Sequence, residues 1–210
     1  MRPTKSYQIV KRILDIILSF IAICVLSWLL IIVAILNCIF TLGHPFYLDP
    51  RIGLKGKEIK VLKFTSMRND AEENPEKYLD KRQMRQWRKE RKVTNDPRVT
   101  WFGKLLRKTS IDELPQLFNI LVGTISIVGP RPITSMELDM NFTKEEREKL
   151  LSVKPGLTGN WAIHGRNTAE CENHDRQNLE LEYVDKISFK TDLVIFFRTF
   201  AAIFMFSEVK

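Results

Sequence analysis

The stretch Ile16–Phe40, IILSFIAICVLSWLLIIVAILNCIF, decides how this chain is organised because it is almost uninterruptedly apolar. A helix that crosses a bilayer needs about 20 apolar residues, and this stretch exceeds that length. It is also longer than the core of a signal peptide, and no small-residue cleavage site follows it, so we expect no cleaved leader. The sequence predicts a membrane helix in residues 1–42 and a second domain in residues 43–210.

Basic residues lie on both sides of the apolar stretch. They are Arg2, Lys5, Lys11 and Arg12 before it, and Arg51, Lys55, Lys57, Lys60 and Lys63 after it. Because cytoplasmic flanks carry the excess of Lys and Arg, both ends are expected in the cytoplasm, which predicts a re-entrant helix. Ser27 is the polar residue at its middle, and Asp15 is expected to pair with Lys11 and Arg12. An ordinary spanning anchor with a short translocated tail remains the alternative.

The composition points to anionic partners. Among 210 residues, 33 Lys and Arg outnumber 25 Asp and Glu, which gives a net charge of +8. Residues 77–92 predict a charged helix, but no nucleic-acid-binding module or platform of stacking aromatics accompanies it, so we expect no nucleic-acid partner. Anionic lipid headgroups explain the basic residues better. The three cysteines show no disulfide framework or metal-binding spacing, which favours a reducing compartment.

The remaining pattern predicts an α+β fold that is predominantly helical, with a few short strands. Residues 45–56 are rich in turn formers, residues 58–64 alternate as in a short strand, and residues 125–128 form a short apolar run. Residues 101–108 are a short basic stretch with an apolar stripe that leads into residues 112 and 113, and a charged helix is expected in residues 142–151. Residues 192–206 are too short to span a bilayer and predict an interfacial or core-packed helix.

Two adjacent carboxylates, Asp112 and Glu113, stand in the run Lys108–Asn119, KTSIDELPQLFN. Pro115 cannot continue a helix from earlier residues, so a helix is expected to begin at about Asp112. Carboxylates in a first helical turn lie beside free N–H groups, a place that suits phosphate chemistry or a Mg²⁺ ligand. The alternative is a capping box formed by Ser110 and Glu113.

Two arginines occupy loops with restricted backbones. Arg131 lies between Pro130 and Pro132, and Arg166 follows Gly165. A guanidinium on a stiff backbone can meet phosphate with fixed geometry, whereas the alternative for each is an ordinary turn residue.

These residues belong to an ordered set of sequence blocks that resembles the monotopic phosphoglycosyl transferases, also called the bacterial sugar transferase family. The blocks are Lys11-Arg12-x-x-Asp15, Arg51-Ile52-Gly53, Lys63-Phe64, Asp112 to Asn119, Val128 to Pro132, Lys154 to Gly159 and Gly165-Arg166-Asn167. Together they extend over nearly the whole chain. The family usually has Ser-Pro where this chain has Ser27-Trp28.

The resemblance implies transfer of a sugar 1-phosphate from a UDP-sugar to polyprenol phosphate through a covalent phosphosugar enzyme. It implies that Asp112 is the nucleophile and a ligand of the cofactor Mg²⁺, and that Glu113 is its partner. The same resemblance places Lys63, Arg107, Arg131 and Arg166 around the phosphates.

The resemblance also implies a catalytic domain in residues 43–210 on the cytoplasmic face of the bacterial inner membrane. Its partners would be a UDP-sugar, polyprenol phosphate, anionic lipids and, as one option, a second copy of the chain. The competing interpretation is a non-enzymatic, membrane-anchored basic adaptor that binds anionic lipid.

Overall fold

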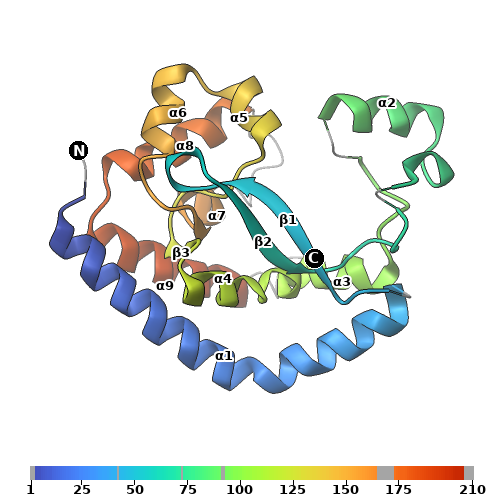
Figure 1. Cartoon of the computed structure of the whole chain (residues 1–210), viewed down its shortest axis with the longest axis horizontal. Coiled ribbons are helices and arrows are strands. Elements are labelled where there is room, and N and C mark those ends of the chain that lie inside the picture. Colours follow the sequence, from blue (N-terminus) through green and yellow to red (C-terminus); the bar gives the residue numbers. More distant parts are fainter. Residues whose placement is uncertain (1–2, 42, 72, 91–92, 165–172, 206–210) are drawn as a thin grey trace. The chain divides into compact units, whose positions relative to one another are not determined.

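The computed structural model describes residues 3–41, 43–71, 73–90, 93–164 and 173–205 (Figure 1). Within these ranges the chain is mostly helical with short strands, as expected. The helices are α1 Lys5–Thr41, α2 Lys81–Glu90, α3 Trp101–Thr109, α4 Gln116–Val122, α5 Ser135–Asn141, α6 Lys144–Leu150, α7 Asn160–His164, α8 Asn173–Asp185 and α9 Phe189–Met205. The strands are β1 Phe46–Ile52, β2 Glu58–Phe64, β3 Ser126–Val128 and β4 Gly156–Thr158, and 3-10 turns cover η1 Leu54–Gly56, η2 Pro75–Lys77 and η3 Ile111–Glu113.

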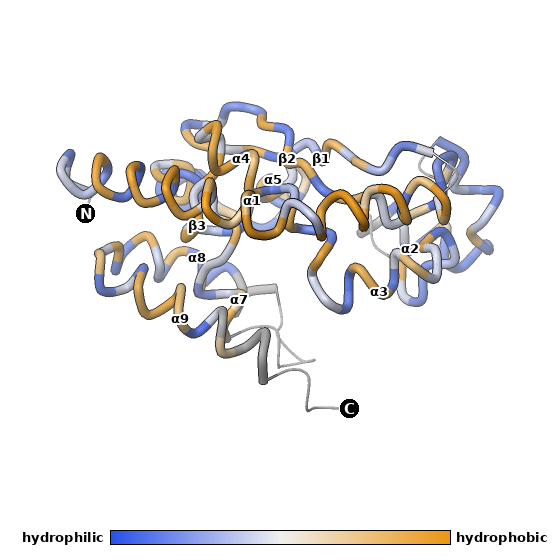
Figure 2. The backbone as a smooth tube through the Cα atoms, turned by 90° about the horizontal axis from the view of Figure 1, so that it is seen from below, coloured by the Kyte–Doolittle hydropathy of each residue, from blue (hydrophilic) through white to orange (hydrophobic). Residues whose placement is uncertain are grey.

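Helix α1 carries the apolar stretch and is 37 residues long. Among the described residues it is the one helix that is long and apolar enough to cross a membrane, judged by length and composition. Figure 2 shows its predominantly hydrophobic colouring, and side chains such as Ile9 and Trp28 are about 60% exposed. The helix runs through Ser27 without an interruption in its assignment. The re-entrant course stays a prediction.

The contacts divide the chain into two compact units. The first unit contains residues 1–24, 49–61 and 116–210, and the second contains residues 25–48 and 62–115. The predicted division at residue 42, between a membrane helix and a catalytic domain, stays a prediction.

The first unit is built around the short parallel pair of β3 and β4, in which Ser126 pairs with Gly156. One side-chain cluster joins this pair to α8 and α9 through Val128, Tyr183 and Ile195. A second cluster lies among α5, α6 and α8, which are seen together in Figure 1. Both clusters bury aliphatic and aromatic side chains, whose removal from water supplies the main driving force for folding.

The start of α1 is bound into the first unit by polar contacts. Asp15 accepts hydrogen bonds from the Ser126 hydroxyl and the Ile127 N–H, at 3.1 and 3.0 Å. Lys11 instead pairs with Asp192 of α9 at 2.5 Å. Arg12 donates to carbonyl oxygens at the end of α4. The positive charges of Lys11 and Arg12 do act on Asp15, as expected, but the direct hydrogen bonds and ion pairs of the three residues are made to partners far away in sequence.

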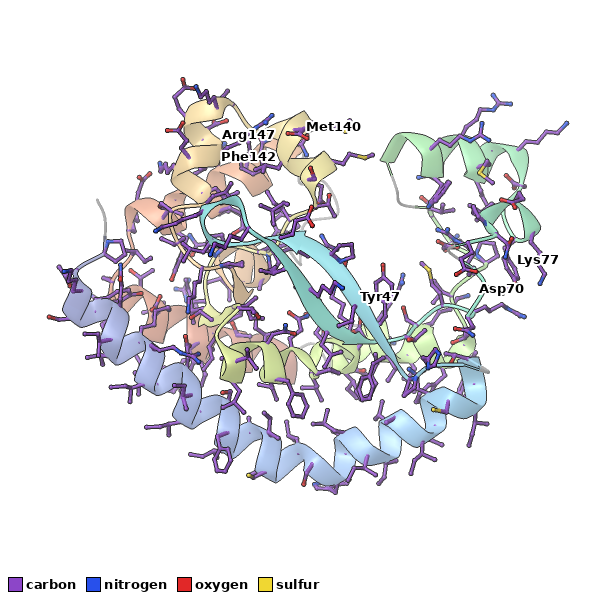
Figure 3. The ribbon with its side chains drawn as sticks, in the orientation of Figure 1. Tyr47, Asp70, Lys77, Met140, Phe142 and Arg147 are labelled. Atoms are coloured by element: carbon purple, nitrogen blue, oxygen red, sulfur yellow. The ribbon has the colours of Figure 1, made fainter. Side chains whose placement is uncertain are left out.

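The second unit packs the later half of α1 against α3 and the end of β2. Its core contains Leu30, Val33, Phe64, Phe102 and Leu106. Phe40 stacks on Phe102 with ring centroids 5.0 Å apart. A surface ion pair between Asp70 and Lys77, at 2.6 Å, closes the loop that precedes α2 (Figure 3).

Several element boundaries differ from expectation. Strand β2 has the expected bounds, but residues 46–52, expected as turns, form β1, which pairs with β2. The helix expected from residue 77 begins at Lys81, after η2. Helix α6 begins at Lys144 rather than 142 because Thr143 and Glu146 form a capping box. Helix α9 begins at Phe189, where the Ser188 hydroxyl accepts the Thr191 N–H at 3.1 Å.

Candidate active site

Asp112 and Glu113 lie on the 3-10 turn η3 rather than in the first turn of an α-helix. The N–H groups of Glu113 and Leu114 each bond to the carbonyl three residues earlier, at 3.2 and 3.1 Å. Pro115 then has no N–H to donate, so the α-helical hydrogen bonds of α4 start after it. The expected helix start near Asp112 is wrong by about one turn.

The capping-box interpretation is also wrong. Ser110 has φ 58°, in the left-handed region, and its side chain makes no capping hydrogen bond. Its N–H instead closes α3 by bonding to the Arg107 carbonyl at 3.3 Å. The Glu113 carboxylate is therefore not engaged in a capping box with Ser110.

Apolar neighbours on both sides hold the two carboxylates in place. Ile111 and Leu114 pack against the second unit's core, which contains Phe102 and Leu106. Asp112 and Glu113, between these two anchors, remain partly accessible. The packing of the two flanking apolar residues thus holds the turn in place and leaves its two adjacent carboxylates accessible to solvent.

The electrostatic surroundings of Asp112 raise its pKa to about 6. Burial is the largest cause, because it disfavours the charged carboxylate, and the neighbouring negative charge of Glu113 adds to it. The positive charges of Lys63 and Arg107 oppose the rise. Near neutral pH Asp112 is consequently mostly ionised, yet more basic than an ordinary aspartate.

Ser66 fixes the position of Arg107. The Arg107 Nε donates to the Ser66 hydroxyl at 2.8 Å. Ser66 is itself held, since its carbonyl accepts the Thr100 N–H at 3.1 Å and the adjacent Met67 pairs with Val99 in an antiparallel bridge. With Nε engaged, the two Nη groups of Arg107 remain for other acceptors.

A buried ion pair supports the same loop. Arg98 and Asp96 form a bidentate pair with an Nη2–Oδ2 distance of 2.7 Å, and both side chains are almost fully buried. The Arg98 carbonyl accepts the Arg68 N–H at 3.0 Å. This pair and Ser66 did not emerge from the sequence, because no motif marks the pairing of Asp96 with Arg98 and because Ser66 lies 41 residues from its partner Arg107. The one signal in the sequence that could have pointed to Ser66 was its position three residues after Lys63, a predicted site residue.

Arg131 belongs to the first unit, where its backbone is closely fixed. Its N–H donates to the buried Glu180 carboxylate at 3.0 Å. The preceding Pro130 carbonyl accepts the Gly156 N–H at 2.8 Å, and a Cβ on Gly156 would lie 2.1 Å from the Gly129 nitrogen. This close approach of two backbones explains the glycines of both loops.

The structure therefore brings four of the six predicted site residues into one unit. Lys63, Arg107, Asp112 and Glu113 belong to the second unit, and Lys63, Arg107 and Glu113 act on the charge of Asp112. Arg131 stands in the first unit, and Arg166 lies outside the described residues.

Asp112 and Glu113 are also candidate ligands of a metal ion. Within the part of the chain that the structure describes, no group of three or more His, Cys, Asp or Glu side chains could hold a metal ion by itself. Mg²⁺ is commonly bound by one or two carboxylates together with substrate phosphates and water. The pair Asp112 and Glu113 fits that donor set.

Comparison with known proteins gives a consistent family match. A family model described as bacterial sugar transferase matches residues 6–206. The exopolysaccharide production protein ExoY of Rhizobium meliloti is 38% identical over 195 residues, which cover 92% of this chain and 84% of that protein.

Longer proteins align with the same part of the chain. An uncharacterized sugar transferase of Haemophilus influenzae is 38% identical over 200 residues, covering 92% of this chain. The undecaprenyl-phosphate galactose phosphotransferase of Salmonella typhimurium is 36% identical over 197 residues, covering 93% of it. The chain spans only 41% and 40% of these two relatives.

Proposed function

Because the chain belongs to the bacterial sugar transferase family, we propose that it transfers a sugar 1-phosphate from a UDP-sugar to polyprenol phosphate. The products are UMP and a polyprenyl diphosphate sugar, the first membrane-bound product of glycoconjugate assembly. The names of relatives support the two substrates: one is an undecaprenyl-phosphate galactose phosphotransferase and another a UDP-galactose-lipid carrier transferase.

The observation that carries the proposal is the setting of Asp112. Its pKa of about 6 leaves an ionised carboxylate near neutral pH, and Lys63 and Arg107 supply positive charge beside it. A carboxylate nucleophile and a diphosphate repel each other, so cations at this place are needed to bring them together.

In the first step, an Asp112 carboxylate oxygen forms a bond to the phosphorus that carries the sugar. The bond from this phosphorus to its bridging oxygen breaks, and UMP leaves with that oxygen. A covalent aspartyl-phosphosugar remains, which divides one difficult transfer into two easier ones. Arg107, held by Ser66, stabilises the negative charge on the phosphate.

In the second step, a phosphate oxygen of polyprenol phosphate forms a bond to the same phosphorus. The bond to Asp112 breaks, and its carboxylate is restored. Glu113 is adjacent and serves either as the acid–base group or as an organiser of the metal. Arg131 and Arg166 are proposed to bind phosphate oxygens.

Mg²⁺ is the proposed cofactor, held by Asp112 with help from Glu113. When bound, it neutralises charge on the diphosphate.

The reaction is proposed to occur at the cytoplasmic face of the bacterial inner membrane. One observation within the first unit supports a re-entrant α1. Tyr7 and Gln8, before the apolar stretch, and Lys55, after it, line one common cavity. Both flanks would then lie on the same side of the membrane, where a UDP-sugar is available.

The test uses purified full-length protein with a panel of UDP-sugars. With polyprenol phosphate present, one or more UDP-sugars should yield UMP and a polyprenyl diphosphate sugar. Without the acceptor, intact mass spectrometry should detect a sugar-phosphate adduct on the wild type and none on Asp112→Asn. An adduct that persists in Asp112→Asn would disprove the nucleophile assignment. No UMP from any UDP-sugar would disprove the activity.

The alternative, a non-enzymatic basic adaptor, would not require this setting. Lipid adhesion explains neither the raised pKa of Asp112 nor the hydrogen bond that orients Arg107. Membership of a family of transferases also favours the enzyme.

A further inference from the structure

A cavity of about 950 Å³ lies in the first unit. The start of α1 forms one wall, η1, α6 and the segment after α6 form others, and β3 and α8 also contribute to the lining. Its volume falls in the range of small-ligand sites. None of Lys63, Arg107, Asp112 and Glu113 lines it.

The cavity is strongly basic. Six cationic side chains line it against the two carboxylates of Asp15 and Glu148. The cations come from four segments and are Lys11, Arg12, Lys55, Lys144, Arg147 and Lys154. A concave surface with this excess of positive charge attracts anions.

Some of these cations already have partners. Arg12 donates to the Ile120 and Leu121 carbonyls at 2.6 and 2.8 Å, where α4 ends. Lys11 pairs with Asp192, and Arg147, labelled in Figure 3, pairs with Asp139 at 2.7 Å. These bonds fix the walls of the cavity.

Lys154 differs from them. It is partly buried, and among the described residues no hydrogen bond or ion pair is recorded for its ammonium. Burial lowers the pKa of Lys154, and repulsion from the Arg12 guanidinium lowers it further, while the Asp15 carboxylate opposes this shift only in part. A bound anion would relieve both effects, since it would offset the lost hydration and screen the repulsion.

The cavity also adjoins the lipid-facing part of α1. Tyr7, Lys11 and Asp15, spaced by four residues, share the helix face that lines it. Ile9 and Ile13 lie on the opposite face and are at least half exposed. The cavity is therefore lined by the turns of α1 in which the helix changes from polar to apolar residues. Figure 2 shows this change in hydropathy along α1. In a membrane-bound helix, lipid headgroups lie at this boundary.

We propose that this cavity binds the phosphate-bearing headgroup of an anionic bilayer phospholipid, with Lys154 as its main charge partner. The acyl chains would follow the apolar face of α1 into the membrane. The inference rests on the membrane location in the proposed function, but not on the sugar transfer itself.

The experiment measures lipid retention by native mass spectrometry of the full-length protein released from detergent micelles. With added phosphatidylglycerol, one lipid per chain should remain bound, whereas phosphatidylcholine should not. Lys154→Gln should weaken retention by roughly tenfold to a hundredfold, as expected for the loss of one charge-assisted bond. Lys154→Arg should retain the lipid. Unfolding curves that match those of the wild type would show that both variants fold.

The matched control is Lys149→Gln, which removes one positive charge from α6 outside the cavity and breaks only a surface pair with Asp185. It should bind lipid like the wild type. Equal losses in Lys149→Gln and Lys154→Gln would mean adhesion by overall charge and would overturn the proposal. Displacement of the lipid by glycerol 3-phosphate or farnesyl phosphate would also overturn it, in favour of a soluble phosphate or the acceptor.

Discussion

The ionisation of Asp112 sets the pH range in which the proposed nucleophile exists. Its raised pKa, about 6, means that the carboxylate gains a proton as the pH falls through that value. We therefore expect kcat/KM for UMP release to be level above neutral pH and to fall by about tenfold per unit well below pH 6.

The measurement is a pH–rate profile with a nucleotide donor whose own ionisation is constant over the range. Wild-type rates that stay level down to about pH 4.5 would show that Asp112 keeps an ordinary acidity, contrary to its burial beside Glu113.

Ser66 should act on catalysis through Arg107. In Ser66→Ala the Arg107 Nε loses its 2.8 Å acceptor, so the guanidinium becomes free to move away from Asp112. Because the Arg107 charge lowers the pKa of Asp112, the midpoint of the pH–rate profile should move to higher pH. We also expect kcat to fall by roughly tenfold, as for the loss of one positioning interaction.

Thr65→Ala is the matched control, since it removes the neighbouring hydroxyl and leaves the Arg107 contact intact. It should leave both the rate and the midpoint unchanged. A lower rate in Ser66→Ala with no shift of the midpoint would indicate a purely structural role for Ser66.

At the scale of elements, the packing of α3 depends on Gly103. A Cβ at this position would lie 2.0 Å from the Ser66 carbonyl oxygen. Helix propensity alone predicts that Gly103→Ala stabilises the protein by about 1 kcal/mol. The clash predicts the opposite sign, a loss of about 2 kcal/mol or more in the free energy of unfolding.

Denaturant unfolding in detergent decides between the two signs. Lys104→Ala, at the next, exposed position of α3, is the control for helix propensity and should be neutral. A stabilised Gly103→Ala would mean that α3 does not pack tightly on the Ser66 backbone.

The elements that the sequence predicted well are those with a strong local pattern. Residues 58–64 alternate and form β2 with the expected bounds, and the basic, apolar-striped stretch from Trp101 forms the helix α3. Strand β1 was missed because its residues, with Pro50 among them, resemble turns. It forms through pairing with β2, and proline is tolerated on an edge strand.

The site was predictable only in part. The spacing of Asp112 and Glu113 and the family resemblance pointed to the carboxylates and to Lys63 and Arg107. No local pattern connects Ser66 with Arg107, 41 residues later, because their contact depends on how the intervening loop folds. The conformation of the carboxylates was also missed, since the left-handed Ser110 that ends α3 has no clear signal in sequence.

For the whole molecule, the main prediction is that α1 is re-entrant, so that the residues before and after it lie on the same side of the membrane. Single cysteines at positions 5 and 55, in a background without Cys24, Cys38 and Cys171, report the side on which each flank lies. If α1 is re-entrant, a membrane-impermeant thiol reagent should label neither site in intact cells and both after lysis. Labelling of position 5 alone in intact cells would establish a spanning helix.

The bonds that hold the start of α1 also have a consequence for biosynthesis. Lys11 and Asp192 are 181 residues apart, and Asp15 is 111 residues from Ser126. At about 5–20 residues per second, a ribosome that has just made Lys11 needs roughly 10–35 s to reach Asp192. The apolar helix therefore leaves the ribosome long before its partners exist. Docking of the polar end of α1 is therefore a late event, and a chain truncated before α9 would lack Asp192, the partner of Lys11.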